Sequence, residues 1–310
     1  MSHSLTHCFA AVALAATAAC AQATTTVRIA PWACTTLADR IHRSGFEANE
    51  TIPSDPSHGS GGAAPGNFMF TYSIAGLGSG TQFAYVYVPY AYTPTRAWPV
   101  VLLLHGAAGS PDWADEQARS VRAAWQGYTN AYGFIVVAPV GNHPQGSWIV
   151  PPTTGPNDYQ FIETVLDDVL ARYNIDRARQ YLWGFSAGGH VAHDLMVNDY
   201  RPGIGRNRFA AYSASAGRLF GLACGGLTEA ACQAKLNTLP RKVPFDLHIG
   251  DEDPMLDPPY NAGLDIGRLQ TAGWVSGDTL NYVVFPGVHE YTSDNVPQIW
   301  QFLCRFAAAQ

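Results

Sequence analysis

The strongest constraint on the fold is the segment Tyr181–His190, which reads Tyr-Leu-Trp-Gly-Phe-Ser-Ala-Gly-Gly-His. Its first half is typical of a buried strand and its second half of a helix, so Ser186 lies at a sharp turn between the two. Such a turn strains the backbone and requires small residues two positions away, here Gly184 and Gly188. The Ser186 hydroxyl is then exposed at a helix N-terminus, where the dipole favours negative charge. The pattern predicts a nucleophilic serine.

Strands and helices are expected to alternate along the rest of the chain. Apolar runs predict strands at 68–74, 83–88, 100–104, 134–138, 181–185, 209–213, 243–249 and 279–285. Helical spacing predicts helices at 113–132, 158–173, 187–197, 259–272 and 294–307. Residues 24–66 are expected to be irregular. This order predicts an α/β fold with a mainly parallel, doubly wound sheet, and no linker or repeat divides the 310 residues into two domains.

The N-terminus has the features of an export signal. Residues 9–19 are apolar and Ala-rich, and residues 21–23 give the small-x-small pattern of a cleavage site. A buried Ala-rich helix and a lipid anchor on Cys20 are the alternatives. We expect residues 1–23 to be a signal peptide and 24–310 to be one domain, secreted or periplasmic, with no membrane span once the signal is removed.

Four of the six cysteines remain after removal of residues 1–23. An even number in an exported protein indicates two disulfides, and four cysteines allow three pairings. We favour a local bond between Cys224 and Cys232, and a bond between Cys34 and Cys304 that ties the N-terminal segment to the last helix.

His289 is the predicted general base. A serine hydroxyl needs a base, and in this architecture the acid and then the base follow the serine along the chain. His289 lies just after the predicted strand 279–285, at the carboxyl end where the base belongs. His190 and His193 lie on the helix after the serine and are expected to point away from its hydroxyl, and His248 lies inside a strand.

The acid that orients the base is expected in the turn after strand 243–249. Asp253 is preferred because its position past the turn lets its side chain reach the His289 loop. Asp251 is the second candidate and Asp257 the third. The same acidic residues suggest Ca²⁺ binding as an alternative, but the glycine and distal glutamate of a calcium loop are missing.

Two backbone N–H groups are expected to form an oxyanion hole. One belongs to Ala187, directly after the serine, and the other to the loop 104–109, whose small residues allow close approach of a substrate. We choose Ala107, with Ala108 as the alternative. His105 is interpreted as a turn residue that orders this loop.

Four short segments together carry a family resemblance: His105-Gly106 after a strand, the turn 184–189, the turn 249–254 and Pro-Gly-Val-His at 286–289. They resemble the extracellular polyhydroxyalkanoate depolymerase and feruloyl esterase group of α/β-hydrolases, whose scaffold is similar to that of poly(aspartic acid) hydrolases. The resemblance covers residues 68–305 and implies a secreted serine hydrolase with a Ser-His-Asp triad, no metal and no organic cofactor. It also implies a lid-like insertion after the sixth strand. Glu290-Tyr291 stands where that group often has Trp-Pro.

The charge distribution suggests an anionic substrate. The net charge is −6, but residues 201–242 contain seven basic residues and one acidic residue, which leaves 11 basic and 23 acidic residues elsewhere. This +6 insertion can steer anions, and Arg206, Arg208 and Arg218 are candidate carboxylate contacts. A solvated surface is the alternative interpretation. The acidic balance of the whole chain argues against nucleic-acid binding.

Trp148 is the candidate apolar substrate contact because it lies in the long loop 141–156. The sequence therefore predicts a serine hydrolase that cleaves ester or amide bonds of a polymer. A feruloyl or acetyl esterase acting on polysaccharide, and a non-catalytic binding protein on a hydrolase scaffold, are the alternatives. The oligomeric state is left open.

Overall fold

A computed structural model describes residues 25–28, 34, 54–62, 64–78, 80–201 and 203–309. The predicted signal peptide 1–23 lies outside these residues. Within them, no helix is both long enough and apolar enough to cross a lipid bilayer.

The centre of the molecule is an eight-stranded sheet in the order β11-β10-β9-β6-β4-β5-β3-β2. Its strands are β2 (Gly66–Ser73), β3 (Thr81–Val88), β4 (Trp98–Leu104), β5 (Ile135–Pro139), β6 (Ile175–Phe185), β9 (Ala211–Ser215), β10 (Phe245–Gly250) and β11 (Leu280–Phe285). The pairs from β11 to β5 are parallel, and only the pairs formed by β3 are antiparallel. The expectation of a mainly parallel sheet is confirmed.

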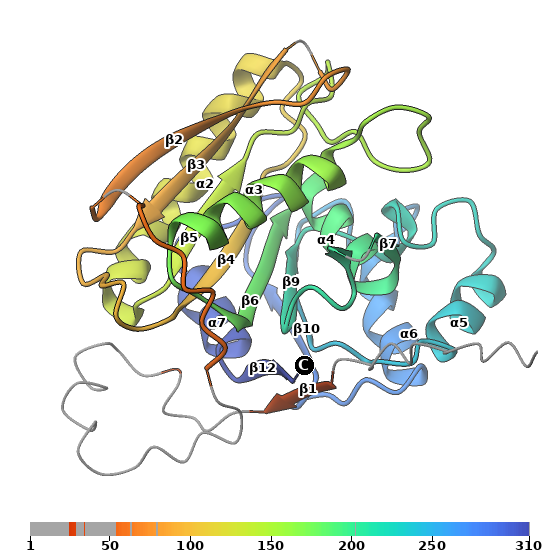
Figure 1. The fold of residues 1–310 in the computed structure, drawn as a ribbon. Coiled ribbons are helices and arrows are strands. Elements are labelled where there is room, and N and C mark those ends of the chain that lie inside the picture. Colours follow the sequence, from red (N-terminus) through yellow and green to blue (C-terminus); the bar gives the residue numbers. More distant parts are fainter. Residues whose placement is uncertain are drawn as a thin grey trace, which may run out of the picture.

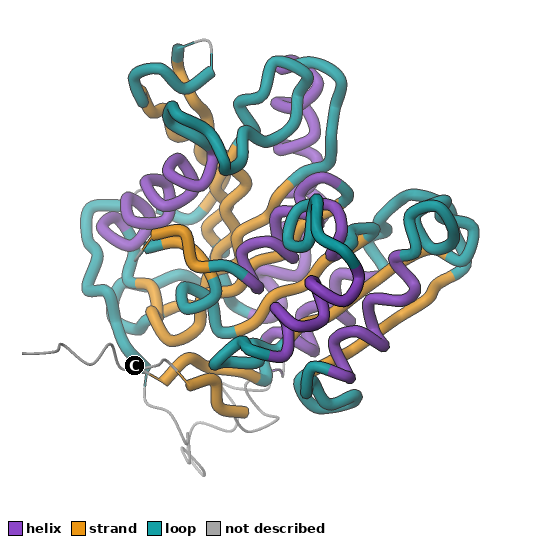
Figure 2. Tube along the Cα trace, turned by 90° about the vertical axis from the view of Figure 1, so that its right-hand side faces the viewer, coloured by secondary structure: helices purple, strands orange, loops and turns teal. Residues whose placement is uncertain are grey.

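Helices cover both faces of this sheet (Figure 1). On one face, α2 (Pro111–Tyr132) and α7 (Asn295–Leu303) bury their apolar sides in a core around Trp125 and Trp300. On the other face, α3 (Asp158–Arg172), α4 (Ala187–Val197) and α6 (Asp265–Thr271) pack on a second core. The turned view shows the strands between helices on either side (Figure 2). The doubly wound α/β class is therefore confirmed.

The two ends of the described chain form a strand pair that the sequence did not predict. β1 (Thr25–Arg28) lies in the segment expected to be irregular, and it pairs antiparallel with β12 (Phe306–Ala309). The helix predicted at 294–307 is therefore too long, since α7 ends at Leu303. The pairing joins residues almost the whole chain apart, so no local pattern reveals it.

The helix predicted at 259–272 is shorter than expected. Asn261 has a left-handed backbone (φ 54°), which a continuous right-handed helix does not accommodate. A 3₁₀ turn, η3 (Ala262–Leu264), follows it, and α6 begins only at Asp265.

The expected insertion 201–242 is not one unit. β9, the sixth strand of the sheet in chain order, interrupts it. Before β9 lies a small hairpin of β7 (Asp199–Arg201) and β8 (Ile204–Gly205). After β9, a crossover with η2 (Leu219–Gly221) and α5 (Glu229–Asn237) leads to β10, and it packs against α4 and α6. The insertion predicted after the sixth strand thus starts at Ala216. The basic residues that precede β9 lie in or next to the β7–β8 hairpin and are not part of this insertion.

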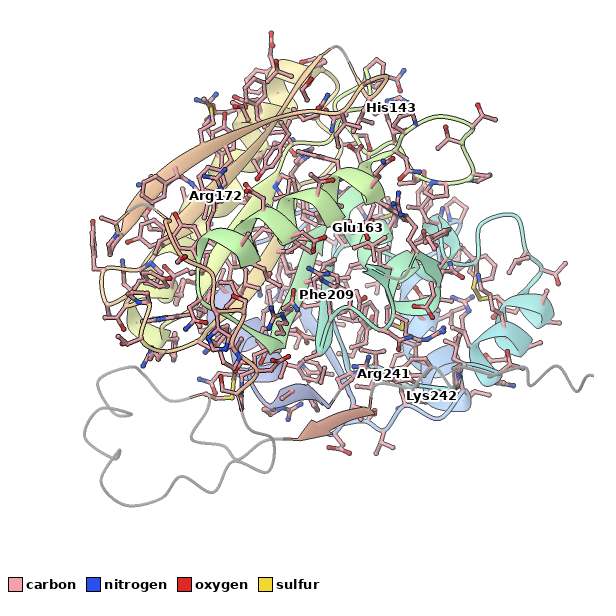
Figure 3. All side chains as sticks on the ribbon, viewed as in Figure 1. His143, Glu163, Arg172, Phe209, Arg241 and Lys242 are labelled. Carbon is pink, nitrogen blue, oxygen red and sulfur yellow. A yellow bond between two sulfur atoms is a disulfide. The ribbon has the colours of Figure 1, made fainter. Side chains whose placement is uncertain are left out.

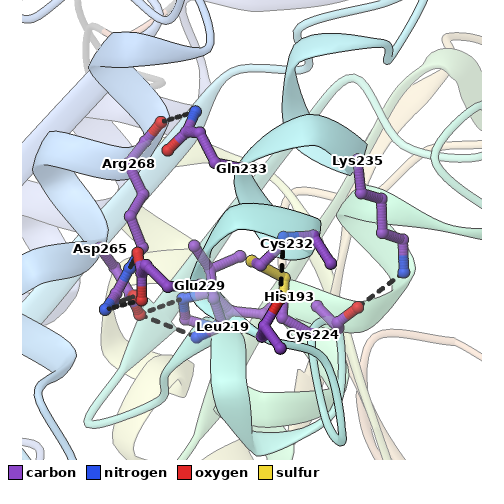
Figure 4. Close-up of a disulfide and its surroundings, with 12 residues drawn as sticks. His193, Leu219, Cys224, Glu229, Cys232, Gln233, Lys235, Asp265 and Arg268 are labelled. Carbon is purple, nitrogen blue, oxygen red and sulfur yellow. Dashed lines mark hydrogen bonds and ion pairs between the residues drawn. A yellow bond between two sulfur atoms is a disulfide. The ribbon is translucent and has the colours of Figure 1, made fainter.

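Two disulfides hold the outer segments. Cys34 is bonded to Cys304, and Cys224 to Cys232, which is the pairing favoured from the sequence. The second bond joins Cys224, in the loop before α5, to Cys232 within α5 (Figure 4). Beside it, Arg268 pairs with Glu229 of α5 and with Asp265 of its own helix, which fastens α5 to α6. The crossover is therefore held by a covalent bond and an ion-pair network.

Replacing both Cys34 and Cys304 by alanine is expected to lower the free energy of unfolding by about 2–5 kcal/mol. The bond joins residues 270 positions apart, so its loss returns far more freedom to the unfolded chain than loss of the bond that spans 8 positions. Urea denaturation of this double variant and of the Cys224/Cys232 double variant measures the two effects. A larger loss from the short-loop pair would contradict the expectation.

Candidate active site

Ser186 lies in the predicted sharp turn between β6 and α4. Its backbone has a positive φ of 51° with ψ −112°, a strained conformation for a residue with a side chain. A Cβ on Gly184 would lie 2.1 Å from the Gly188 carbonyl oxygen, and a Cβ on Gly188 would lie 2.3 Å from that of Leu104. Both neighbours must therefore be glycine, and the strained turn presents the Ser186 hydroxyl above the carboxyl edge of the sheet.

His289 and Asp253 reach Ser186 from loops that follow the last two strands. The Ser186 Oγ lies 2.8 Å from Nε2 of His289. The Nδ1 of His289 lies 3.0 and 2.9 Å from the two carboxylate oxygens of Asp253. The Asp253 side chain is fully buried, whereas that of His289 is 32% exposed. The structure thus brings together the three residues predicted as nucleophile, base and acid.

The neighbouring acidic residues have different positions. Asp251 is exposed, and its Oδ1 accepts a hydrogen bond of 3.0 Å from the Gly287 N–H. Asp257 is also exposed. Asp253 additionally accepts a bond from the Met255 N–H (2.8 Å), which fixes its carboxylate toward His289. Asp251 therefore braces the His289 loop from outside, and Asp253 is the acid in contact with the imidazole.

Two aromatic rings pack beside the imidazole of His289. The His289 ring lies 5.3 Å from the ring of Phe185, and Tyr291 packs against Phe185 at 5.0 Å. Sequence reasoning did not assign a role to either residue. The only signal was their position, one next to the serine and the other two residues after the histidine.

Two backbone N–H groups in the segments that adjoin Ser186 have no partner within the described chain. Ala187 is the first residue of α4, and neither its N–H nor that of Ala107 has a hydrogen-bond partner among the described residues. The Ala108 N–H donates to the Gly146 carbonyl (2.9 Å), which leaves Ala107 as the available donor of its loop. A Cβ on Gly106 would lie 3.2 Å from the Ser186 Cβ, so this loop lies directly against the serine.

His105 fixes the orientation of the Ala107 N–H. Its Nδ1 lies 2.6 Å from the Gly106 carbonyl oxygen, and its Nε2 accepts a bond from the Gly141 N–H (2.9 Å). Since Nε2 is an acceptor, the proton lies on Nδ1 and holds the Gly106 carbonyl, and the Ala107 N–H of the same planar peptide must point the opposite way. Burial lowers the pKa of His105 to about 4, which keeps this neutral tautomer at working pH.

Trp148 is not placed as a surface contact for substrate. Its side chain is only 6% exposed, its ring lies 4.7 Å from that of His105, and its Nε1–H donates to the His105 carbonyl (2.9 Å). Trp148 does lie in the long loop, as predicted. Its side chain points inward because the indole N–H donates to a buried acceptor, the His105 carbonyl oxygen. Trp148 supports the loop 104–109 through these contacts with His105.

Replacing His105 by phenylalanine is expected to lower kcat by up to about 10²-fold with little change in KM, because a misplaced donor weakens only the transition state. Phenylalanine keeps the packing on Trp148 and removes both ring hydrogen bonds. Trp148→Phe, which also loses one bond beneath the same loop, is the control for packing. Steady-state kinetics on a neutral ester measure the effect, and a rise in KM at constant kcat would contradict it.

Two of the three arginines predicted to contact substrate lie away from this site. Arg206 bonds to the Val197 carbonyl at the end of α4 (2.7 Å) and pairs with Asp199, while Arg208 pairs with Asp167 of α3 (3.0 Å). Both precede β9, so they lie at the edge of the sheet opposite the serine. Figure 3 shows Arg241 and Lys242 likewise at the far end of the molecule from His143, whose loop follows β5. The prediction was wrong for Arg206 and Arg208 because they precede β9, whereas the part of the segment near Ser186 follows it. Residues close in sequence therefore lie at opposite edges of the sheet.

The other histidines also lie outside the Ser186–His289–Asp253 arrangement. His193 is buried and its Nδ1 bonds to the Gly189 carbonyl (2.8 Å), and His248 pairs with Asp246 inside the sheet (2.9 Å). His190 is half-buried one helical turn after Ser186. Among the described residues, no group of three His, Cys, Asp or Glu side chains has the arrangement of a metal site.

Parts of the chain are similar to known esterases. Residues 79–204 match the family model described as "Putative esterase". A bifunctional acetylxylan esterase/xylanase of Neocallimastix patriciarum is 30% identical over 136 residues, which are 42% of this chain and 19% of that protein. A solved ferulic acid esterase covers 78% of this chain and 98% of its own, with a TM-score of 0.58 and 18% identity. The fold is that of an α/β-hydrolase.

A second α/β-hydrolase, an S-formylglutathione hydrolase from Agrobacterium tumefaciens, matches 82% of this chain and 98% of its own (TM-score 0.56, 17% identity). These matches confirm the resemblance to the esterase group that the sequence motifs indicated. Residues 79–204 are therefore similar to an esterase family.

Proposed function

We propose that the protein is a serine esterase that acts through an acyl-enzyme, with Ser186 as nucleophile, His289 as general base and Asp253 as orienting acid. The observation that carries the proposal is the continuous line of contacts from the Ser186 hydroxyl through His289 to the buried Asp253 carboxylate. Nothing else in the described chain pairs a strained, half-buried serine with a histidine and an acid.

The mechanism follows from these contacts. As Ser186 Oγ attacks the ester carbonyl, its proton passes to His289 Nε2, and Asp253 stabilises the imidazolium through Nδ1. The N–H groups of Ala187 and Ala107 stabilise the oxyanion. His289 returns the proton to the departing alcohol, and a water molecule activated by the same histidine hydrolyses the acyl-enzyme.

We further propose a polymer as the substrate and an oxidising compartment as the location. Two disulfides, together with the signal-like residues 1–23, support export. The ester is either in the polymer backbone or a side group on a polysaccharide, and the partial identity with an acetylxylan esterase/xylanase favours the second arrangement.

A fluorophosphonate probe tests the catalytic proposal directly, because it reacts covalently only with an activated serine. Labelling of the wild type at Ser186 is expected. An unlabelled wild type would instead favour a non-catalytic binding protein on this fold.

Product analysis then identifies the polymer. Polyhydroxybutyrate, acetylated xylan, feruloylated xylan and poly(aspartate) are incubated in parallel with the wild type and Ser186→Ala. Soluble oligomers from polyhydroxybutyrate indicate backbone cleavage, whereas free acetate or ferulate indicates side-group cleavage. Release from poly(aspartate) alone would contradict an ester substrate.

A further inference from the structure

The basic residues of the segment 201–242 are almost all engaged within the protein. Six of the seven bind carboxylates or backbone carbonyls, namely Arg201, Arg206, Arg208, Lys235, Arg241 and Lys242. The side chain of the seventh, Arg218, has neither a hydrogen bond nor an ion pair within the part of the chain that the structure describes. Among the basic residues of this segment, Arg218 is therefore the one whose guanidinium has no hydrogen-bond or ion-pair partner among the described residues.

Arg218 lies on the same edge of the sheet as Ser186. β9 runs beside β6, and the Ser186 N–H donates to the Ser215 carbonyl at the end of β9 (2.9 Å). Arg218 follows three residues later. Between them, Gly217 lies directly against Gly189, since a Cβ on Gly217 would be 2.6 Å from the Gly189 carbonyl carbon. The chain that carries Arg218 thus forms the wall next to the first turn of α4.

The ring of Tyr260 holds the guanidinium by one face. The Arg218 Cζ lies 5.1 Å from the ring centroid, and Tyr260, from the loop after Asp253, is 42% exposed. The Arg218 Nε–H is buried, but contact with an aromatic face leaves the terminal N–H groups of a guanidinium to bind a carboxylate, whose geometry their planar fork matches. The protein therefore restrains the cation without using its hydrogen-bond donors.

Among the described residues, no acid forms an ion pair with this cation. Asp265 lies within electrostatic reach of Arg218, but its Oδ1 pairs with Arg268 (2.6 Å) and its Oδ2 accepts from the Leu219 N–H (2.8 Å). The charge of Arg218 also acts on His190, which lies one helical turn after Ser186. Burial, with the charges of Arg218 and His289, lowers the pKa of His190 to about 4.

We propose that Arg218, stacked on Tyr260, is the residue by which the active site recognises a carboxylate carried by the substrate near the bond that Ser186 attacks. This inference rests on the proposed serine esterase function and names its substrate class as anionic esters. The carboxylate lies either on the acyl group or on the leaving alcohol, and both arrangements present the same chemistry to the guanidinium.

Two pairs of esters test the proposal. 4-Nitrophenyl hemisuccinate and 4-nitrophenyl butyrate differ by a carboxylate on the acyl side. 4-Acetoxybenzoate and its methyl ester differ by a carboxylate on the leaving-group side. In at least one pair, Arg218→Gln is expected to lower the anionic-to-neutral ratio of kcat/KM by about 10–100-fold, the range for a lost hydrogen bond to a charged group.

Arg208→Gln is the matched control, because Arg208 belongs to the same basic segment but pairs with Asp167 at the far edge of the sheet. It is expected to keep the wild-type ratio, and Arg218→Lys is expected to restore part of it. Equal ratios for wild type and Arg218→Gln in both pairs would overturn the proposal, while Ser186-dependent cleavage of the neutral esters would leave the proposed function standing.

A binding measurement separates the two proposals further. In the Ser186→Ala background, titration calorimetry with succinate is expected to detect binding that disappears when Arg218→Gln is added. Retention of succinate binding in that double variant would also overturn the proposal, whatever the catalytic activity.

Discussion

Ser186→Ala is expected to lower kcat for ester hydrolysis by about 10⁶-fold, the scale seen when a nucleophilic serine is removed from an enzyme of this mechanism. The hydroxyl is the group that forms the covalent intermediate, and the Oγ–Nε2 contact of 2.8 Å that activates it is lost with it. Hydrolysis of 4-nitrophenyl butyrate by wild type and variant measures the effect, and circular dichroism checks that the fold is kept.

Ser293→Ala is the control for this substitution. Ser293 is exposed and lies four residues after His289, with no part in the contacts of the active site. It should keep the wild-type kcat. Substantial activity in Ser186→Ala would show that the reaction uses another nucleophile, and the assignment of all three residues would then fail.

Asp253→Asn is expected to lower kcat by about 10⁴-fold. The carboxylate fixes the His289 proton on Nδ1 and stabilises the imidazolium, and an amide of the same shape does neither reliably. Because asparagine keeps the volume and an acceptor for the Met255 N–H, the turn itself should stay in place.

Asp251→Asn provides the matched control, two residues away in the same turn. Asp251 touches the backbone of Gly287 and not the imidazole, so its variant should lose no more than about tenfold through a slight shift of the loop. The kcat values of the two variants on the same neutral ester decide the matter. A greater loss for Asp251→Asn would make Asp251 the acid and contradict the geometry.

Local patterns predicted the regular elements well where burial is simple. The helix 187–197 was predicted with its observed bounds, and the strands 100–104 and 134–138 lie within one or two residues of β4 and β5. Errors occurred where a long-range contact overrides the local pattern. The chain after α7 turns into β12 because β1 is available to pair with it, and nothing near residue 306 indicates that partner.

The predicted basic surface also failed because long-range contacts are not visible in the sequence. The count of residues over 201–242 predicted a basic surface. However, strand β9 lies inside that range and runs from one edge of the sheet to the other, so Arg208 and Arg218 lie at opposite edges. Arg206, Arg208 and Arg241 then meet acids or carbonyls on neighbouring elements. Only the positions of those partners show that the Arg218 guanidinium has no hydrogen-bond or ion-pair partner in the described part of the chain.

The sequence by itself determined the strained serine turn, because the requirement for Gly184 and Gly188 is a steric property of neighbouring residues. It also determined the order of serine, acid and histidine along the chain. Only the tertiary structure decided that Asp253 and not Asp251 contacts His289. It also decided that the N–H of Ala107, and not that of Ala108, is without a partner in the described chain. The same holds for the Arg218 guanidinium, which has no hydrogen-bond or ion-pair partner there. Each of these depends on distances between loops brought to one edge of a parallel sheet, and such distances are set by the packing of the whole chain.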